Sequence, residues 1–481
     1  MNNRRFARSL FAFLVLLSPV GGVADAPPVH AGEIPLTLQA AIDRALSNRL
    51  LLRMATIDIE NARRAIAEAK GAYRPQMNLE ANVRRVENYD DFTGLEVVAN
   101  VQGQDVPLRV DRIVPEYNVN GGLNLKLNLY SGGQISARVR EAESELAAVQ
   151  AQREIERRDI IIDVAISYWA VKKAHIRYLS VTEAVRLARS DAQLADREWD
   201  LGKISEIERD EIHLFLLEQQ IEQTRAQTDL DDALRRYVVA LGYDEKAAYH
   251  SSDVASRFLD DAGSIDISEL VGLYRSAVNP ELAQAHANLD AARARQNMVR
   301  SEHYPKFDLI GRYLESGRDN DTLSDAVSDL NRAEWSIGVE LNWPFYNGSQ
   351  TTNRVAQAEG EVRRSKLALG LKRINLEEEQ KDKASEVALL KEQVRLATMQ
   401  LEVSRRKERI AEQKAQTGRG TVFDYHRARI ETNDVKTKLE TIQIDWVTAQ
   451  ITYALMAGND SLQEIHSLSR ISGQAANLEK H

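Results

Sequence analysis

The sequence predicts an α+β membrane protein built from two copies of one unit, in which a helix precedes two strands and a long helical hairpin. Three observations support this fold class. Strict alternation of apolar and polar residues marks short strands. Residues 134–201 contain neither Pro nor Gly, which favours an unusually long helix. Residues of the first half recur in the second half at a constant offset, the signature of an internal duplication.

The clearest strand lies between Tyr117 and Tyr130, and the same alternation recurs between Glu334 and Phe345. Shorter alternating stretches follow Pro75 and Pro305, so we expect four strands with one apolar and one polar face each. The residues expected to face water are Asn120, Asn124, Lys126, Asn128, Glu340 and Asn342.

The duplication has an offset of 216 residues, as in the pairs Tyr130/Tyr346, Gly202/Gly418 and Tyr237/Tyr453. It predicts the organisation of the chain after an N-terminal leader. The expected parts are a first repeat (32–242), a linker or equatorial region (243–266), a second repeat (267–458) and a polar tail (459–481).

Helices are expected on either side of each strand pair. Residues 36–71 read as one helix with Thr37 as its N-cap and an apolar stripe at Leu38, Ile42, Leu46, Leu50 and Met54. Residues 134–201 then form a helix of roughly 100 Å, and a break at Gly202 returns the chain as a hairpin. Segments 87–114 and 317–333 read as surface loops between the strands.

The N-terminus indicates export. Arg4, Arg5 and Arg8 precede the apolar run Leu10–Leu17, which predicts a signal peptide over residues 1–31 with cleavage after Ala31. A rival cleavage motif is Ala24-Asp25-Ala26. The chain has no Cys and therefore no disulfide, and its net charge of −9 disfavours a nucleic-acid partner.

Four strands cannot close a barrel, and open edges would leave unpaired N–H and C=O groups in lipid. Three chains supply twelve strands and twelve hairpin helices, so a homotrimer would join a β-barrel to a helical tube. Aromatic residues at the strand-to-helix end are expected at the membrane interface: Tyr130, Trp343, Phe345 and Tyr346. The alternatives are a soluble β-sandwich for the strands and a structural coiled coil for the helices.

The segment 36–81, the junction NLYSGGQISARVREAESEL and both hairpin turns resemble the TolC family of outer-membrane efflux and secretion ducts. The resemblance covers nearly all of residues 36–458. It implies a homotrimer with a 12-stranded transmembrane β-barrel continuous with a periplasmic α-helical barrel. Such passive ducts sit in the outer membrane and dock onto a periplasmic adaptor coupled to an inner-membrane transporter of the RND or ABC type. Efflux and type I secretion both use this fold.

The resemblance also implies roles for the hairpin turns. Candidate adaptor contacts are Gly202, Lys203 and Ile204 in the first turn and Gly418, Arg419 and Gly420 in the second. The alternative reading of both glycines is a helix reversal that needs a residue with positive φ.

Family members often narrow the tube with aspartate rings after the second turn. Asp424 matches the first such position, Arg427 stands where a second aspartate is common, and Glu208 is the acidic residue after the first turn. We hypothesise that Asp424 and Arg427 bind each other or neighbouring chains and hold the closed state. The alternative is a solvated surface pair of little energetic consequence.

Catalytic motifs are missing from the sequence. There is no P-loop, dinucleotide fingerprint, nucleophile elbow or His-based metal pair, so neither an enzyme nor a cofactor is expected. The competing functions are a periplasmic adaptor, which carries one hairpin among β-rich domains, and a structural coiled-coil protein.

Overall fold

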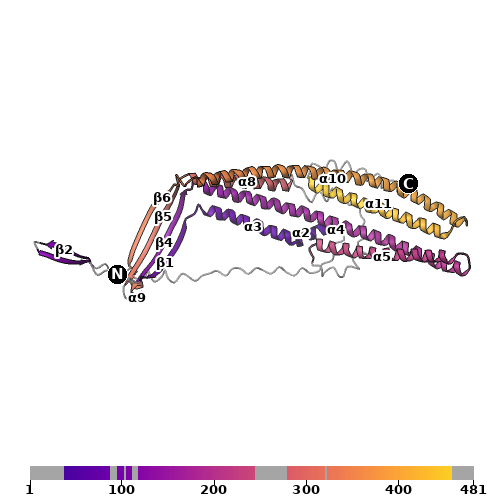
Figure 1. Ribbon diagram of the computed structural model, residues 1–481, viewed down its shortest axis with the longest axis horizontal. Helices are drawn as coiled ribbons and strands as arrows, with labels where there is room; N and C mark the ends of the chain where they lie inside the picture. The colour runs from indigo at the N-terminus through magenta and orange to yellow at the C-terminus, as the bar shows by residue number, and fades with distance from the viewer. Residues whose placement is uncertain are drawn as a thin grey trace.

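The computed structural model describes residues 37–86, 95–101, 104–110, 117–243, 279–319 and 322–457. The predicted signal peptide, the tail and all of the linker except its first residue lie outside these ranges. The boundaries of the two repeats therefore stay predictions. The described elements form an elongated molecule with a β-sheet at one end and the turns of two helical hairpins at the other (Figure 1).

The sheet contains β1 (Gln76–Arg85), β4 (Tyr117–Tyr130), β5 (Lys306–Asp319) and β6 (Arg332–Asn342) in the order β1-β4-β5-β6. All three pairings are antiparallel. Both edge strands have a sheet neighbour on one side only within the described chain. The two predicted strand pairs therefore exist and meet in one sheet.

The register assembles one apolar and one polar face. Leu79, Leu123, Tyr313 and Trp335 form one row across the four strands. All four side chains are exposed, from 41% for Leu123 to 74% for Trp335. The adjacent row points the other way and is polar: Asn78, Asn124, Arg312 and Ser336.

The two predicted loops contain regular structure, so that expectation is wrong in part. Within 87–114, β2 (Leu95–Val101) pairs antiparallel with β3 (Gln104–Val110). Within 317–333, β5 continues to Asp319 and the short helix α9 (Leu323–Ser328) follows. The valines of the first segment favour strands, and its Gly and polar residues obscured that preference.

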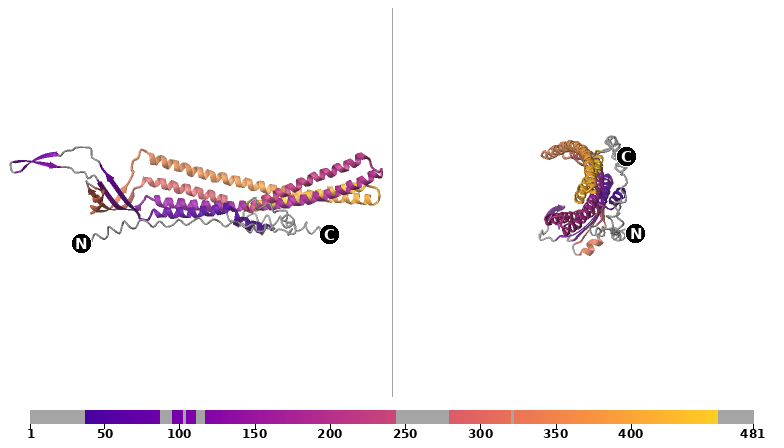
Figure 2. Two further views of the ribbon diagram at one scale, coloured as in Figure 1. Left: turned by 90° about the horizontal axis from the view of Figure 1, so that it is seen from below. Right: turned by 90° about the vertical axis from the view of Figure 1, so that its right-hand side faces the viewer.

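The long helices are α4 (Gln134–Asp200) and α10 (Gln350–Gln416), each of 67 residues. Each returns through a shorter helix, α5 (Glu206–Ala240) or α11 (Val422–Ala457). Helix α8 (Pro280–Arg300) and the 3₁₀ turn η2 (Ser301–His303) precede β5. Viewed along its length, the helical part is a crescent with α2 and α3 on its convex side (Figure 2).

The helix predicted over 36–71 is divided at Arg49 into α2 (Leu38–Asn48) and α3 (Leu50–Gly71). Arg49 leaves the helical region because its guanidinium pairs with Asp163 of α4, and its Nε donates to the Ala240 carbonyl at 2.9 Å. The predicted apolar stripe consequently ends near Leu46, and Leu50 and Met54 are exposed. Thr37 caps α2 as expected, accepting from the Ala40 N–H at 3.3 Å.

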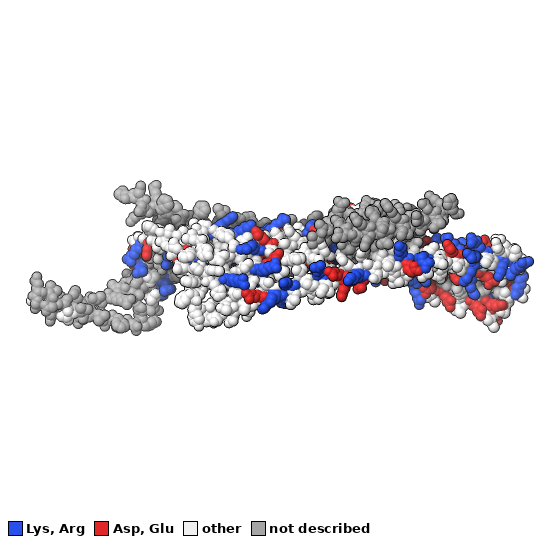
Figure 3. Space-filling model, turned by 90° about the horizontal axis from the view of Figure 1, so that it is seen from above, with Lys and Arg blue, Asp and Glu red and all other residues white. Residues whose placement is uncertain are grey.

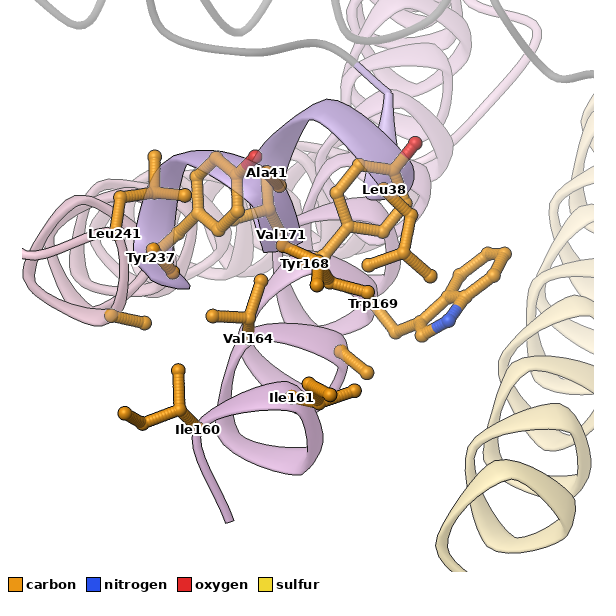
Figure 4. Close-up of a cluster of buried hydrophobic side chains, with 14 of the residues drawn as sticks. Leu38, Ala41, Ile160, Ile161, Val164, Tyr168, Trp169, Val171, Tyr237 and Leu241 are labelled. Carbon is orange, nitrogen blue, oxygen red and sulfur yellow. The ribbon is translucent and has the colours of Figure 1, made fainter. Parts of the chain in front are cut away.

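The main core lies midway along the molecule, where α2 packs against α4 and α5 (Figure 4). Val164, Tyr168 and Val171 of α4 meet Tyr237 of α5 and Leu241, the residue after α5, beneath α2. A separate apolar cluster joins α10 to α11 through Ala397, Leu401, Val435 and Leu439. None of the described helices contains a stretch apolar enough to cross a bilayer.

Candidate functional site at the hairpin tips

The first hairpin reverses in a turn closed at both ends by hydrogen bonds. Gly202 has φ +67°, and its N–H donates to the Trp199 carbonyl at 2.8 Å. The Lys203 N–H donates to the Glu198 carbonyl at 2.8 Å, which completes a Schellman motif. A Cβ on Gly202 would meet nothing within 4 Å, so glycine is needed there for backbone conformation and not for space.

Ser205 and Glu208 then start α5 as a capping box. Glu208 Oε2 accepts from the Ser205 N–H at 2.8 Å, and the Glu208 N–H donates to Ser205 Oγ at 3.2 Å. Glu208 accepts hydrogen bonds from the Ser205 N–H and, at 2.9 Å, from the Ser205 hydroxyl. Both bonds lower the pKa of Glu208 below its usual value, the backbone bond more than the hydroxyl bond.

The second hairpin repeats this construction. Gly418 has φ +69°, and the Arg419 N–H donates to the Lys414 carbonyl at 2.9 Å. Asp424 Oδ2 accepts from the Thr421 hydroxyl at 2.7 Å and from the Thr421 N–H at 3.2 Å. Both bonds lower the pKa of Asp424, and the bond from the Thr421 hydroxyl has the larger effect. Thr421 and Asp424 stand 216 residues after Ser205 and Glu208, so the duplication extends to the caps.

The structure therefore places Glu208 and Asp424 at helix starts, where a carboxylate also meets the positive end of the helix dipole. Arg427 does not join Asp424 in an ion pair within the described chain. Its guanidinium lies over the ring of Phe215 on α5, 5.8 Å from the centroid. The Ser-x-x-Glu and Thr-x-x-Asp spacings were readable as capping signals, and the sequence reasoning missed them.

The predicted adaptor contacts lie at the end of the molecule. Gly202, Lys203, Gly418 and Arg419 are exposed, whereas Ile204 and Gly420 are half-buried. The sequence reasoning missed two apolar side chains beside the first turn, Leu201 and Ile207, which are 69% and 72% exposed. Their signal was an apolar residue on each side of a polar turn.

Polar contacts between α4 and α11 join the two hairpins; we call this line of contacts the seam. Nearest the tips, the Asp191 carboxylate bonds to Nδ1 of His426. Glu183 follows with Arg429 at 3.1 Å, and the Ser180 hydroxyl with the Asn433 amide at 2.9 Å. Burial raises the pKa of Asp191, although His426 and then Arg427 oppose the shift. Sequence spacing does not reveal these pairs because their members lie more than 230 residues apart.

The predicted interface aromatics gather where the sheet meets the helices. Tyr130, Trp343, Phe345 and Tyr346 are all exposed, and the Trp343 indole donates to the His303 carbonyl at 3.1 Å. Tyr73 and Tyr304, each just before a strand, lie at the same end and were not predicted. Their signal was an aromatic residue shortly before Pro75 or Pro305.

The hairpin end is rich in charge. On the face shown in Figure 3, Lys and Arg are interspersed with Asp and Glu over this end. Among the described residues, no group of three His, Asp or Glu side chains is arranged to hold a metal ion.

A family model described as "Outer membrane efflux protein" matches residues 41–243 and 276–459, well over half of the 481 residues. The chain belongs to the outer membrane efflux protein family. The resemblance seen in the sequence is thereby confirmed. Since the outer membrane efflux proteins are channels of the outer membrane, the expectations of an outer-membrane location and of no enzymatic activity are confirmed too.

Two curated proteins of this family illustrate the degree of similarity. Outer membrane protein OprJ of Pseudomonas aeruginosa is 24% identical over 329 residues, 67% of this chain and 63% of OprJ. Cobalt-zinc-cadmium resistance protein CzcC of Cupriavidus metallidurans is 25% identical over 356 residues, 72% of this chain and 74% of CzcC. The match to OprJ thus spans less than two thirds of that relative.

The fold is that of solved outer-membrane efflux channels. The CmeC outer membrane channel of Campylobacter jejuni superimposes with a TM-score of 0.69 at 17% identity. The superposition covers 89% of this chain and 88% of CmeC. The predicted combination of few strands with many helical residues is confirmed at this level.

Proposed function

We propose that this efflux-family protein is the outer-membrane duct of a tripartite export system, through which cargo passes unchanged. The observation that carries the proposal is the apolar face of the sheet, which is exposed along the row Leu79–Leu123–Tyr313–Trp335. In water that face would be costly, whereas lipid covers it without further protein. Strands β4 and β6 of this sheet lead into the long helices α4 and α10, so one passage can traverse membrane and periplasm.

The duct is proposed to be a homotrimer with a 12-stranded barrel. The four strands alternate in direction, so β6 of one chain is antiparallel to β1 of the next when the edges pair. Pairing removes the open edges that lipid would not tolerate. Three chains are the number that the barrel size and the family resemblance support.

Exposed apolar residues continue this subunit interface along the helices. One edge of the chain carries β1, α3 and α5, and the other carries β6 and α10 (Figure 1). On α5 the stripe has seven-residue spacing: Ile207, Leu214 and Ile221. On α10 the spacing is the same: Leu389, Leu396, Val403 and Ile410. Such spacing is typical of helices that pack as a coiled coil, so α5 of one chain fits α10 of its neighbour.

The remaining partners follow from the tips. The exposed turns around Gly202 and Gly418 are proposed to contact a periplasmic adaptor, which couples the duct to an inner-membrane transporter of the RND or ABC type. The family description favours efflux, and type I secretion is the alternative. CzcC is named for cobalt, zinc and cadmium resistance, which makes divalent metal ions one candidate cargo.

The gate is proposed to involve Asp424, Arg427 and Glu208. Three Asp424 carboxylates near the axis would attract cations by field focusing, and Arg427 would offset them. Because Arg427 is not paired with Asp424 within one chain, the proposed contact is between neighbouring chains. Asp424→Ala and Arg427→Ala trimers in lipid bilayers test the gate. Wild-type conductance in both variants would exclude it.

The duct itself is tested by the mass of the detergent-solubilised protein and by its conductance in planar bilayers. We expect three chains per particle, membrane-spanning conductance and recovery with the outer membrane on fractionation. A periplasmic adaptor would fractionate with the inner membrane. A lone particle without conductance would instead support the structural coiled-coil alternative.

A further inference from the structure

The Asp191–His426 contact is the hydrogen bond between the two hairpins that lies nearest the tips. Asp191 stands nine residues before the end of α4, and His426 is in the second turn of α11. Within the described chain, no hydrogen bond or ion pair connects the hairpins closer to their turns. Of the hydrogen bonds in the seam, this one is therefore the first that a separation starting at the tips meets.

The seam differs in character from the packing inside the second hairpin. Helices α10 and α11 meet through the buried apolar residues Ala397, Leu401, Val435 and Leu439. Near the tips, α4 and α11 share the polar pairs of the seam and one small apolar cluster of Ala184, Leu187 and Ile430 with Phe215. Polar pairs exchange with water at lower free-energy cost than apolar burial does. The two helices of each hairpin also contact each other more extensively than α4 contacts α11, so the seam is the line along which the hairpins part.

The contact contains a titratable group on each side in a shielded place. The Asp191 side chain is 9% exposed and the His426 side chain 16%. An imidazole is the side chain whose charge ordinarily changes between pH 5 and 8. When His426 is neutral, its Nδ1–H can still donate to the carboxylate. When it is protonated, the bond joins two opposite charges and strengthens.

Charged groups surround the contact on several helices. On α10, which packs against α11, Lys407 pairs with Glu431 of α11 at 3.4 Å. On α11, Arg427 stands next to His426 and Arg429 bonds to Glu183. On α4, Glu183 also binds Arg186 at 2.6 Å, so one carboxylate is shared by two guanidinium groups. On α5, His213 bonds to Asp196 of α4 at 2.9 Å and stays within the first hairpin.

We propose that Asp191 and His426 form a proton-sensitive latch between the hairpins of one chain, which holds the tips closed more firmly when the periplasm acidifies. The proposal rests on the proposed duct function, since it describes how that duct opens. Sufficient acid eventually protonates Asp191 itself, whose pKa is raised by burial, and the ion pair is then lost. Closure is therefore tightest when His426 is protonated and Asp191 is still ionised.

Conductance of reconstituted trimers at pH 7.5 and pH 6.0 tests the latch. We expect wild-type conductance to fall about fivefold at pH 6.0, the difference between a charge-assisted and a neutral hydrogen bond. His426→Gln and Asp191→Asn should conduct more at both values and lose the pH response. His213→Gln is the matched control, because its His–Asp pair lies inside one hairpin, and it should keep the wild-type response.

A second measurement separates failure of the latch from failure of the duct. Spin labels on Lys203→Cys and Arg419→Cys, in a chain without native Cys, report the distance between the two tips. Labelled chains are diluted with unlabelled ones so that distances within a chain dominate. The distance between the labels should be longer at pH 7.5 than at pH 6.0. In His426→Gln it should be long at both pH values. A pH response retained in His426→Gln, or lost in His213→Gln, would overturn the latch. Pores that never conduct would refute the duct alone.

Discussion

Asp424 and Thr421 bind each other at the start of α11. The carboxylate accepts from the threonine hydroxyl at 2.7 Å and the threonine N–H at 3.2 Å, while the Asp424 N–H donates to the hydroxyl at 3.0 Å. Asp424, which the family resemblance implies to be a gate residue, thus also caps the start of α11. Substituting Asp424 changes the charge at the tip and the order of the turn together, and experiments need to separate the two.

Thr421→Ala separates them because it removes the cap and leaves the Asp424 charge. We expect opening of the first turn of α11 to become easier by about 1 kcal/mol, the usual cost of losing an N-cap. Amide hydrogen exchange at residues 422–426 measures this. Thr421→Ser is the control, since serine retains the hydroxyl. Unchanged exchange in Thr421→Ala would show that the cap does not stabilise the turn.

Gly202 and Gly418 are predicted to resist substitution for reasons of backbone conformation alone. Both have positive φ and open space around them, so Gly202→Ala and Gly418→Ala should each destabilise the turn by about 1 kcal/mol. Gly360 lies inside α10, also with open space, and Gly360→Ala should instead stabilise that helix by up to ~1 kcal/mol. Amide hydrogen exchange of the residues beside each substituted glycine measures the three effects. Equal effects in all three would contradict the argument.

The proposed subunit interface predicts a specific cross-link. Ile221 of α5 and Val403 of α10 both lie roughly 20 Å from their hairpin turns, so they are at matching height on neighbouring chains. Ile221→Cys combined with Val403→Cys should give disulfide-linked dimers and trimers on non-reducing gels. Arg405→Cys replaces Val403→Cys in the control, because Arg405 points about 200° away around the helix. Equal cross-linking in the control pair would argue against α5–α10 pairing.

Glu281 predicts acid sensitivity in the helical part. Its side chain is 13% exposed and pairs with Lys372 and, at 2.7 Å, with Arg158. Burial acts to raise the pKa of Glu281, but the bonds to Lys372 and Arg158 prevail and lower it. A carboxyl with a depressed folded pKa stabilises the protein above its unfolded pKa of about 4.3. That contribution is lost as the pH falls through the folded pKa.

Glu281→Gln should accordingly cost about 2 kcal/mol at pH 7.5, because it leaves the buried guanidinium of Arg158 with only the exposed carboxylate of Asp159 as an acidic partner. The deficit should shrink as the pH is lowered below 4. Thermal unfolding of the detergent-solubilised protein provides the Tm of each form. Glu392→Gln is the control, since Glu392 forms an exposed pair with Arg395 on one helix and its loss should leave the Tm unchanged. Equal Tm losses in both variants would remove the special role of Glu281.

The local pattern was sufficient for much of the architecture. Alternation between Tyr117 and Tyr130 predicts β4, the stretch without Pro or Gly predicts α4, and Gly202 and Gly418 mark both turns. These features depend on near neighbours, whose periodicity and backbone preferences act wherever the chain lies. The capping boxes belong to the same class and were readable, although the gate interpretation of Glu208 and Asp424 obscured them.

Other features depend on residues far apart in sequence. Arg49 leaves its helix because Asp163 and the Ala240 carbonyl stand beside it, and Arg427 turns to Phe215 because α5 packs there. The Asp191–His426 contact arises only when α11 lies along α4. The sequence by itself determined the elements, their duplication and the two-faced strands, because those follow from local periodicity. Only the tertiary structure decided which charges meet, because pairing energies depend on distances that the folded chain sets.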